Sequence, residues 1–264
     1  MALVEVEQVT KEYARGSASG VKRVVDGVSF VIEPGETLGL VGESGSGKTT
    51  VARMILGLTQ PTSGRIRVAG VDLAGAGAAQ MKALRRQMQP VFQDPFAALN
   101  PRMKVLEIVS EPWAIHGLPE EGPRMPLRER ATQLLDQVGL EASALDRFPH
   151  EFSGGQRQRI NIARALALQP RLLILDEPVS ALDVSVGAQI VNLLRRLQQE
   201  HGLTYLFISH SMPLVRYLST RIAVMERGRL VETGETEQLC AHPCQAYTRQ
   251  LLAATPELPV AVSY

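Results

Sequence analysis

The chain has 264 residues, of which 45% are hydrophobic and 21% charged, and its formal net charge is +1. That length allows one large domain or two modest ones to bury a core without cross-links, and so small a net charge excludes binding to nucleic acid or an anionic membrane through bulk electrostatics. Two cysteines, Cys240 and Cys244, are too few for a disulfide scaffold or, alone, for a metal site, which indicates a reduced compartment.

We expect no export signal at the N-terminus. Residues Met1 to Tyr13 lack the basic start and the apolar run of a signal peptide. No window of the sequence approaches the roughly 20 apolar residues that span a bilayer. We therefore expect any membrane role to come through a partner protein.

Short β-branched runs open the chain. They lie at Val4 to Val9 and at Val21 to Ile32, and they predict an antiparallel β region. Thr37 to Val41 then predicts a buried strand that breaks into glycines. A helix is expected next, because apolar residues recur at helical spacing at Val51, Met54, Ile55 and Leu58.

The middle of the chain changes character. After a further predicted strand at Ile66 to Val71, a proline-rich segment with long polar side chains runs from about Val91 to Glu151, and we interpret it as a helical insertion. Helices and strands alternate again from Arg157, and a polar tail with a proline follows Leu239. Such alternation predicts a mainly parallel sheet covered on both faces, with strands at Leu172 to Leu175, Tyr205 to Ile208 and Ile222 to Met225.

The glycine-rich stretch after the buried strand matches the P-loop pattern, in which backbone N–H groups surround phosphates at a helix N-terminus. Lys48 supplies a mobile positive charge for the β and γ phosphates, and the Thr49 hydroxyl suits Mg²⁺. A Gly/Ser surface loop is the alternative, but the flanking strand and helix favour phosphate binding. The stretch reads Gly42, Glu43, Ser44, Gly45, Ser46, Gly47, Lys48, Thr49.

Polar residues also follow other predicted strands. Asp176 and Glu177 end an apolar run. Asp176 would hold Mg²⁺ through water, and Glu177 would polarise the attacking water as general base. His210 is placed for a γ-phosphate contact, and Gln93 for both Mg²⁺ and water. Each of these residues, taken alone, is also compatible with an ordinary polar strand end.

A second glycine-rich motif begins at Ser153. Ser153 and Gln156 form a capping-box pattern at a helix start, and Gly154 and Gly155 leave the backbone bare. The helix N–H groups there predict a second anion site. The alternative is a helix cap that binds no phosphate.

The ordered set of these motifs resembles the ATPase subunits of ABC transporters over nearly the whole chain. The resemblance implies an α/β fold, namely a P-loop NTPase core with an N-terminal antiparallel β subdomain and an inserted helical subdomain. It implies one ABC ATPase domain over residues 1–264. Its expected parts are 1–92 with 165–238, a helical signature subdomain at 93–164 and a tail at 239–264.

The resemblance also implies a composite ATP site. ATP and Mg²⁺ on the P-loop of one subunit would be closed by Ser153 to Gln156 of another, identical or homologous subunit, with Asp183 in the loop that crosses the interface. Tyr13 is similar to the residue that stacks on adenine, although tyrosine is common on edge strands. ATP contacts are expected to include Thr50, and the implied Mg²⁺ ligands are Thr49, Gln93 and, through water, Asp176.

Within the family, Val91 to Arg102 and the tail segment His242 to Arg249 are similar to bacterial importers of peptides or nickel. The expected partners are two transmembrane permease subunits and an extracytoplasmic substrate-binding protein, with no nucleic acid, at the cytoplasmic face of the inner membrane. The sequence departs from the family pattern at Phe152, at Ser211 after His210 and at Gln245. The missing cysteine-rich extension argues against an iron–sulfur cluster and slightly favours the metal-linked relatives.

Two other classes share these motifs. A soluble ABC ATPase of DNA repair or translation usually has a coiled-coil arm or tandem cassettes, and neither is present here. A regulatory subunit that does not hydrolyse ATP is disfavoured because the motif residues are all present, namely Glu177, Gln93, His210 and Ser153.

Overall fold

The protein is described from a computed structural model, which describes residues 1–14, 20–118 and 125–254. These residues fall into two compact units. The first joins the described residues of 1–76 to those of 205–254, and the second contains the described residues of 77–204. The subdomain boundaries at residues 92, 164 and 238 stay predictions.

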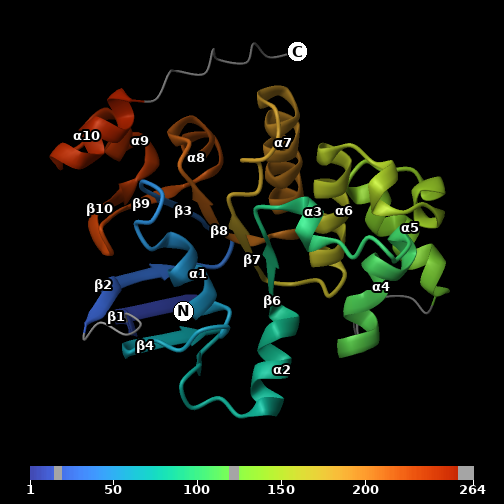
Figure 1. The fold of residues 1–264 in the computed structure, drawn as a ribbon, viewed down its shortest axis with the longest axis horizontal. Coiled ribbons are helices and arrows are strands. Elements are labelled where there is room, and N and C mark those ends of the chain that lie inside the picture. The colour runs from blue at the N-terminus through green and yellow to red at the C-terminus, as the bar shows by residue number, and fades with distance from the viewer. Residues whose placement is uncertain (15–19, 119–124, 255–264) are drawn as a thin grey trace. The chain divides into compact units, whose positions relative to one another are not determined.

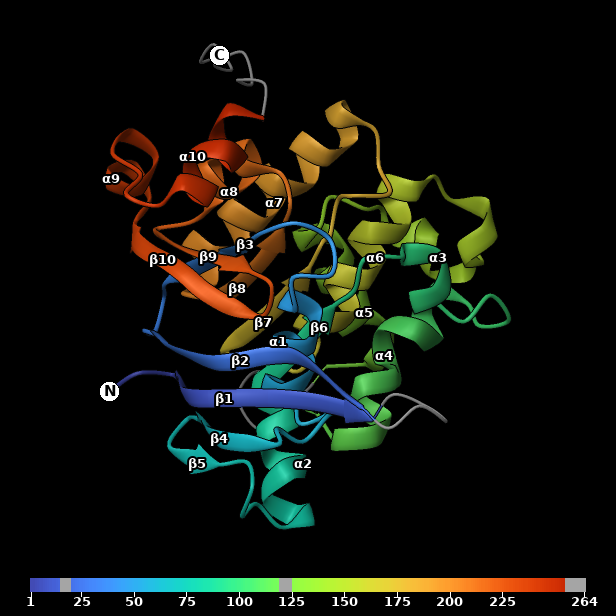
Figure 2. The same ribbon diagram turned by 60° about the vertical axis from the view of Figure 1, so that its left-hand side comes forward.

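An antiparallel sheet in the first unit confirms the predicted β region at the N-terminus. Its strand order is β2-β1-β4-β5, and Figure 2 shows β1 between β2 and β4. The prediction of a single strand from Ile66 to Val71 was wrong, because two strands, β4 and β5, meet there. Ala69 and Gly70, with φ of 49° and 78°, turn the chain there into a hairpin. The strands are β1 (Val4–Ala14), β2 (Val21–Ile32), β4 (Ser63–Val68) and β5 (Val71–Asp72).

Parallel strands form the core of the same unit. Val41 at the end of β3 is level with Ser209 of β8 and with Val224 of β9, so the carboxyl ends of these strands share one edge. Strands β3 and β8 are buried along their whole length, as expected for parallel strands covered on both faces. The strands are β3 (Thr37–Val41), β8 (Thr204–Ser209), β9 (Arg221–Glu226) and β10 (Arg229–Glu235), the last antiparallel to β9.

Helix α1 (Lys48–Ile55) follows β3, as predicted, but it ends before Leu58. Gly57 adopts a left-handed φ of 65°, which stops the helix and leaves Leu58 57% exposed. The unit also contains α8 (Met212–Leu218), α9 (Thr236–Ala241) and α10 (Ala246–Ala253), and Figure 1 shows α9 and α10 after β10.

The second unit is mainly helical, and it contains the segment 93–164 for which we expect a helical subdomain. Its two strands, β6 and β7, pair in parallel. Among the residues that the structure describes, none of the helices combines the length and the apolar character needed to cross a bilayer. The elements are α2 (Ala78–Gln87), β6 (Met88–Val91), α3 (Pro95–Ala98), α4 (Val105–His116), α5 (Leu127–Gln137), 3₁₀ turns at Ala142–Asp146 and Pro149–Glu151, α6 (Gly154–Leu166), β7 (Leu172–Asp176) and α7 (Val184–His201).

A buried hydrogen bond joins two helices of this unit, and it gives a test of the packing. The indole N–H of Trp113 on α4 donates to the carbonyl oxygen of Ala167, just after α6, at 2.6 Å. Trp113→Phe leaves that carbonyl without its donor and reduces the packed volume. We expect it to lower the free energy of unfolding by about 1–3 kcal/mol in urea, followed by far-UV circular dichroism. An unchanged unfolding midpoint would show that the bond does not stabilise the helical unit.

Candidate functional site

The predicted phosphate loop links β3 to α1 through two glycines that tolerate no side chain. Gly42 has φ 152°, and a Cβ there would lie 2.1 Å from the carbonyl oxygen of Met225. Gly47, the residue before α1, has φ 108°, and its Cβ would lie 2.7 Å from the carbonyl oxygen of Val24. The loop therefore packs backbone against backbone and ends at the N-terminus of a helix, where N–H groups favour an anion.

Lys48 lies across this loop. Its Nζ donates to the carbonyl oxygens of Gly42 at 2.7 Å and Glu43 at 2.8 Å, and to Ser46 Oγ at 3.3 Å. The side chain is only 5% exposed. A buried ammonium on carbonyl oxygens beside a helix N-terminus fits a phosphate group, because phosphate oxygens are stronger acceptors for the same donor.

Two of the residues expected to hold Mg²⁺ each offer an oxygen that suits the ion, one in each unit. Thr49 is exposed on the first turn of α1, and Asp176 is a 7% exposed carboxylate at the end of β7. The described parts of the chain contain no group of three His, Cys, Asp or Glu side chains suited to a metal ion. Mg²⁺ usually takes one or two protein oxygens and completes its shell with water and phosphate, so a small ligand set is sufficient.

His210 lies at the same sheet edge as the loop. The parallel pair Val41 and Ser209 is followed directly by Gly42 on one strand and His210 on the other. The His210 side chain is exposed. The structure thus brings this residue to the phosphate loop, and its contact with the γ-phosphate stays a prediction.

Tyr13 lies near the end of β1, opposite Lys22 of β2. Its side chain is 42% exposed, and Lys11 Nζ lies 5.1 Å from the ring centroid. An exposed ring next to a cation is compatible with stacking on a base. The adenine contact stays a prediction.

In the second unit, β6 and β7 bring Gln93 and Glu177 to one edge. Val91 is level with Leu175, and Gln93 and Glu177 each lie two residues beyond that pair. Glu177 has a left-handed φ of 49°, and Ser180 donates both its N–H and its hydroxyl to the Glu177 carbonyl oxygen. Such strain in a non-glycine residue concentrates at functional sites, which supports the prediction for Glu177.

The capping box predicted at Ser153 is confirmed. Gln156 N–H donates to Ser153 Oγ at 3.3 Å, and Ser153 N–H donates to Gln156 Oε1 at 3.0 Å. A Cβ on Gly155 would lie 2.3 Å from Val186 Cγ1 on the first turn of α7. Asp183, expected at the subunit interface, caps that same turn by accepting from Val186 N–H at 2.9 Å.

Sequence reasoning missed three side chains that connect these motifs. Gln158 is fully buried and donates to the carbonyl oxygen of Pro178 at 2.7 Å, which ties α6 to the turn after Glu177. Arg157 lies 4.0 Å from the centroid of the Phe96 ring on α3, and Arg164 donates to the carbonyl oxygen of Ala98 at 2.7 Å. The two arginines are about two helical turns apart, so one face of α6 holds α3. Only that spacing signals their role.

Known proteins are similar to this chain in sequence and in fold. A family model described as "ABC transporter" matches residues 25–180. A putative peptide import ATP-binding protein of Brucella ovis is 51% identical over 96% of this chain and 78% of its own length. The oligopeptide transport ATP-binding protein OppF of Streptococcus mutans is 49% identical over 97% of this chain and 82% of its own length.

Solved structures of ATP-binding cassettes have the same fold. The dimeric cassette MJ0796 with ADP and phosphate superposes with a TM-score of 0.77 at 30% identity, covering 88% of this chain and 98% of that one. The protein cbiO1 from Clostridium perfringens, part of an ABC transporter complex, also gives 0.77, at 27% identity over 91% of each chain. The predicted fold class is confirmed.

The tight contact at Gly47 gives a test of the loop. Gly47→Ala forces the Cβ against the Val24 carbonyl, and we expect ATP binding, measured by isothermal titration calorimetry, to weaken at least about tenfold. Gly35→Ala is the matched control, because Gly35 also has a positive φ, 77°, but a Cβ there would meet nothing within 4 Å. Equal affinities for both variants would argue against a loop that depends on backbone packing.

Proposed function

The chain belongs to the ABC transporter family as one of its ATP-binding and ATP-hydrolysing subunits, and we propose that it powers the import of peptides. The observation that carries this proposal is the identity of about half of all residues to peptide import ATP-binding proteins over nearly the whole chain. Those relatives favour peptide over nickel, the other cargo compatible with the sequence. Their identity outweighs the slight preference for metal-linked relatives that the sequence analysis expressed.

In the proposed reaction, the phosphate loop holds the triphosphate of ATP. Lys48 exchanges the Gly42 and Glu43 carbonyls for β and γ phosphate oxygens, and the N-terminal dipole of α1 adds positive potential. Mg²⁺, when bound with ATP, neutralises phosphate charge. Thr49 would hold it directly, with Gln93, and Asp176 through water.

The residues at the strand ends would direct the attack of water on the γ-phosphate. Glu177 polarises the water as general base, and Gln93, at the same sheet edge, helps to position it. His210 holds the γ-phosphate from the edge that β8 shares with the phosphate loop. Little covalent chemistry is required of the protein, because phosphoryl transfer depends mainly on positioning and charge.

Each ATP site is proposed to need a second, homologous ATPase subunit. Ser153 and Gln156 are exposed at the N-terminus of α6, where helix N–H groups can face a phosphate of the partner's ATP. Asp183 is exposed at the start of α7 beside them. The 30% identical cassette MJ0796 was solved as a dimer with ADP and phosphate, which supports a paired arrangement here.

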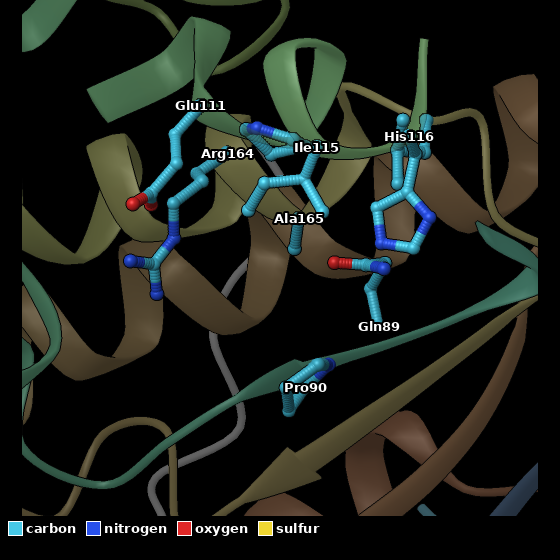
Figure 3. A pocket seen from close by; sticks show the side chains of 9 residues that line it. Gln89, Pro90, Glu111, Ile115, His116, Arg164 and Ala165 are labelled. Carbon is cyan, nitrogen blue, oxygen red and sulfur yellow. The ribbon is translucent and has the colours of Figure 1, made fainter. Parts of the chain in front are cut away.

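A hollow in the second unit suits a permease contact. It has a volume of about 180 Å³, and exposed Ile115 lies over a floor of Pro90 and Ala165. Figure 3 shows Glu111 and Arg164 at one end, and His116 and Gln89 at the other. We assign this hollow to a cytoplasmic segment of one of two transmembrane permease subunits.

The hollow is physically joined to the predicted ATP-site residues of its unit. Gln89 and Pro90 belong to β6, which leads to Gln93. Arg164 lines the hollow and donates from α6 to the carbonyl oxygen of Ala98, the last residue of α3, so a contact in the hollow can act on the helix that begins at the Ser153 motif. Because the permease subunits cross the membrane, the proposed contact would place this subunit at the cytoplasmic face of the inner membrane. An extracytoplasmic binding protein would deliver the peptide to the permease.

Replacement of the proposed general base tests the hydrolytic site. Glu177→Gln should keep ATP affinity within about twofold, slow turnover by at least about 100-fold and trap the closed pair, because the amide cannot accept the proton of water. Equilibrium binding, phosphate release and size-exclusion chromatography with ATP measure the three effects. Glu200→Gln, at an exposed glutamate near the end of α7, is the control. Near-normal turnover in Glu177→Gln would overturn the assignment.

A charge in the hollow tests the permease contact. Ile115→Glu should leave the ATPase rate of the reconstituted pair unchanged but reduce peptide uptake by proteoliposomes with permease and binding protein at least about tenfold, because it buries a charge at the interface. The matched control is Leu58→Glu, since Leu58 and Ile115 are 57% and 59% exposed. Normal peptide uptake with Ile115→Glu would show that the hollow does not contact the permease. In the same assay with the unaltered chain, uptake of nickel but not of peptide would refute the proposed cargo.

A further inference from the structure

The tail segment His242 to Arg249, which the proposed reaction does not use, reaches the phosphate loop. It forms a turn and the first part of α10. Within this segment Tyr247 is half-buried, and its hydroxyl accepts a hydrogen bond of 3.0 Å from the backbone N–H of Glu43. The two residues are 204 positions apart in the sequence. The tail therefore contacts the backbone of the phosphate loop directly.

The turn before Tyr247 is firmly held on β10. The carboxylate of Glu232 accepts from the N–H groups of Cys244 at 2.8 Å and Gln245 at 3.1 Å. Burial raises the pKa of Glu232, but the hydrogen bonds it accepts outweigh burial and keep the pKa below its usual range, so the carboxylate is ionised at neutral pH. Arg249 closes the turn by donating to the carbonyl oxygens of Pro243 and Cys244, both at 3.0 Å.

The strand pair that carries the tail also holds the other end of the loop. Gly228, in the turn between β9 and β10, donates its N–H to the carbonyl oxygen of Ser46 at 3.0 Å. The loop is therefore fixed at Ser46 by the β9–β10 turn and at Glu43 by Tyr247. Both contacts use backbone groups of the loop, so they do not depend on its side chains.

Glu43 is bound on both sides of its backbone. Its N–H donates to Tyr247, while its carbonyl oxygen accepts from Lys48 Nζ at 2.8 Å. When Lys48 turns to phosphate oxygens, the loop loses the bonds from Lys48 to Gly42 and Glu43. The bond to Tyr247 does not involve Lys48 and can persist through that exchange.

We propose that Tyr247 is a positioning residue for ATP binding, whose hydroxyl holds the Glu43 backbone in place while Lys48 exchanges its carbonyl partners for phosphate. The tail is then a brace of the phosphate loop, anchored by Glu232. This inference goes beyond the proposed transport function and rests on it only in requiring that the loop bind ATP.

Removal of one hydroxyl tests the brace. Tyr247→Phe keeps the ring and deletes the acceptor, and we expect the Kd for MgATP and the KM of the pair to rise about fivefold, with kcat at saturating ATP unchanged within about twofold. Tyr217→Phe, which deletes the hydroxyl of a tyrosine on α8, should bind ATP as the unaltered chain does. Thermal unfolding of each variant shows whether the fold is kept.

A second variant separates the brace from a local effect of the ring. Glu232→Ala removes the anchor without touching the loop, and it should weaken ATP binding to a similar extent. The double variant should bind no more weakly than the weaker single one, because both act through one contact. An unchanged Kd for Tyr247→Phe, or full additivity with Glu232→Ala, would overturn the inference. Lys48→Ala shows separately whether the loop binds ATP, so failure of the proposed function is distinguishable.

Discussion

The parallel pairing of β3 with β8 and β9 sets the position of the phosphate loop. Because Val41 is level with Ser209 and Val224, the chain leaves all three strands at one edge. The loop begins there at Gly42, which packs against the Met225 carbonyl. His210 is the first residue after the neighbouring strand β8. Ligands of parallel α/β sheets gather at this edge for the same reason, namely that helix N-termini and strand ends meet there. The chemistry of the loop thus depends on strand register before it depends on any side chain.

Within that frame, the loop is held mainly through its backbone. Gly228 bonds to Ser46 and Tyr247 bonds to Glu43, whereas Lys48 makes bonds that it can exchange. In the proposed ATP site, fixed backbone contacts together with one mobile ammonium would preorganise the loop for an anion, because little of the loop would have to move when phosphate binds. In the second unit, α6 has a comparable role, since Gln158 and Arg164 connect the Ser153 motif to the turn after Glu177 and to α3.

The sequence predicted well those features that neighbouring residues determine. The phosphate loop, the start of α1 and the capping box at Ser153 depend on residues a few positions apart, and all lie where expected. The hairpin turn at Ala69 and Gly70 was missed, because an apolar run continues through it. The contact between Tyr247 and Glu43 could not be predicted, since it depends on how β10 and the tail fold back beside β3. Motif spacing carries no information about such distant pairs.

We propose that one chain provides half of each ATP site. The decisive measurement of this dependence on pairing is ATP turnover per chain over a range of protein concentrations, with molar mass determined by light scattering on the same samples. We expect every chain to bind ATP, whether paired or not, and the turnover of the sample to rise in proportion to the fraction of paired subunits. A demonstrable monomer with rapid turnover that does not depend on concentration would contradict it.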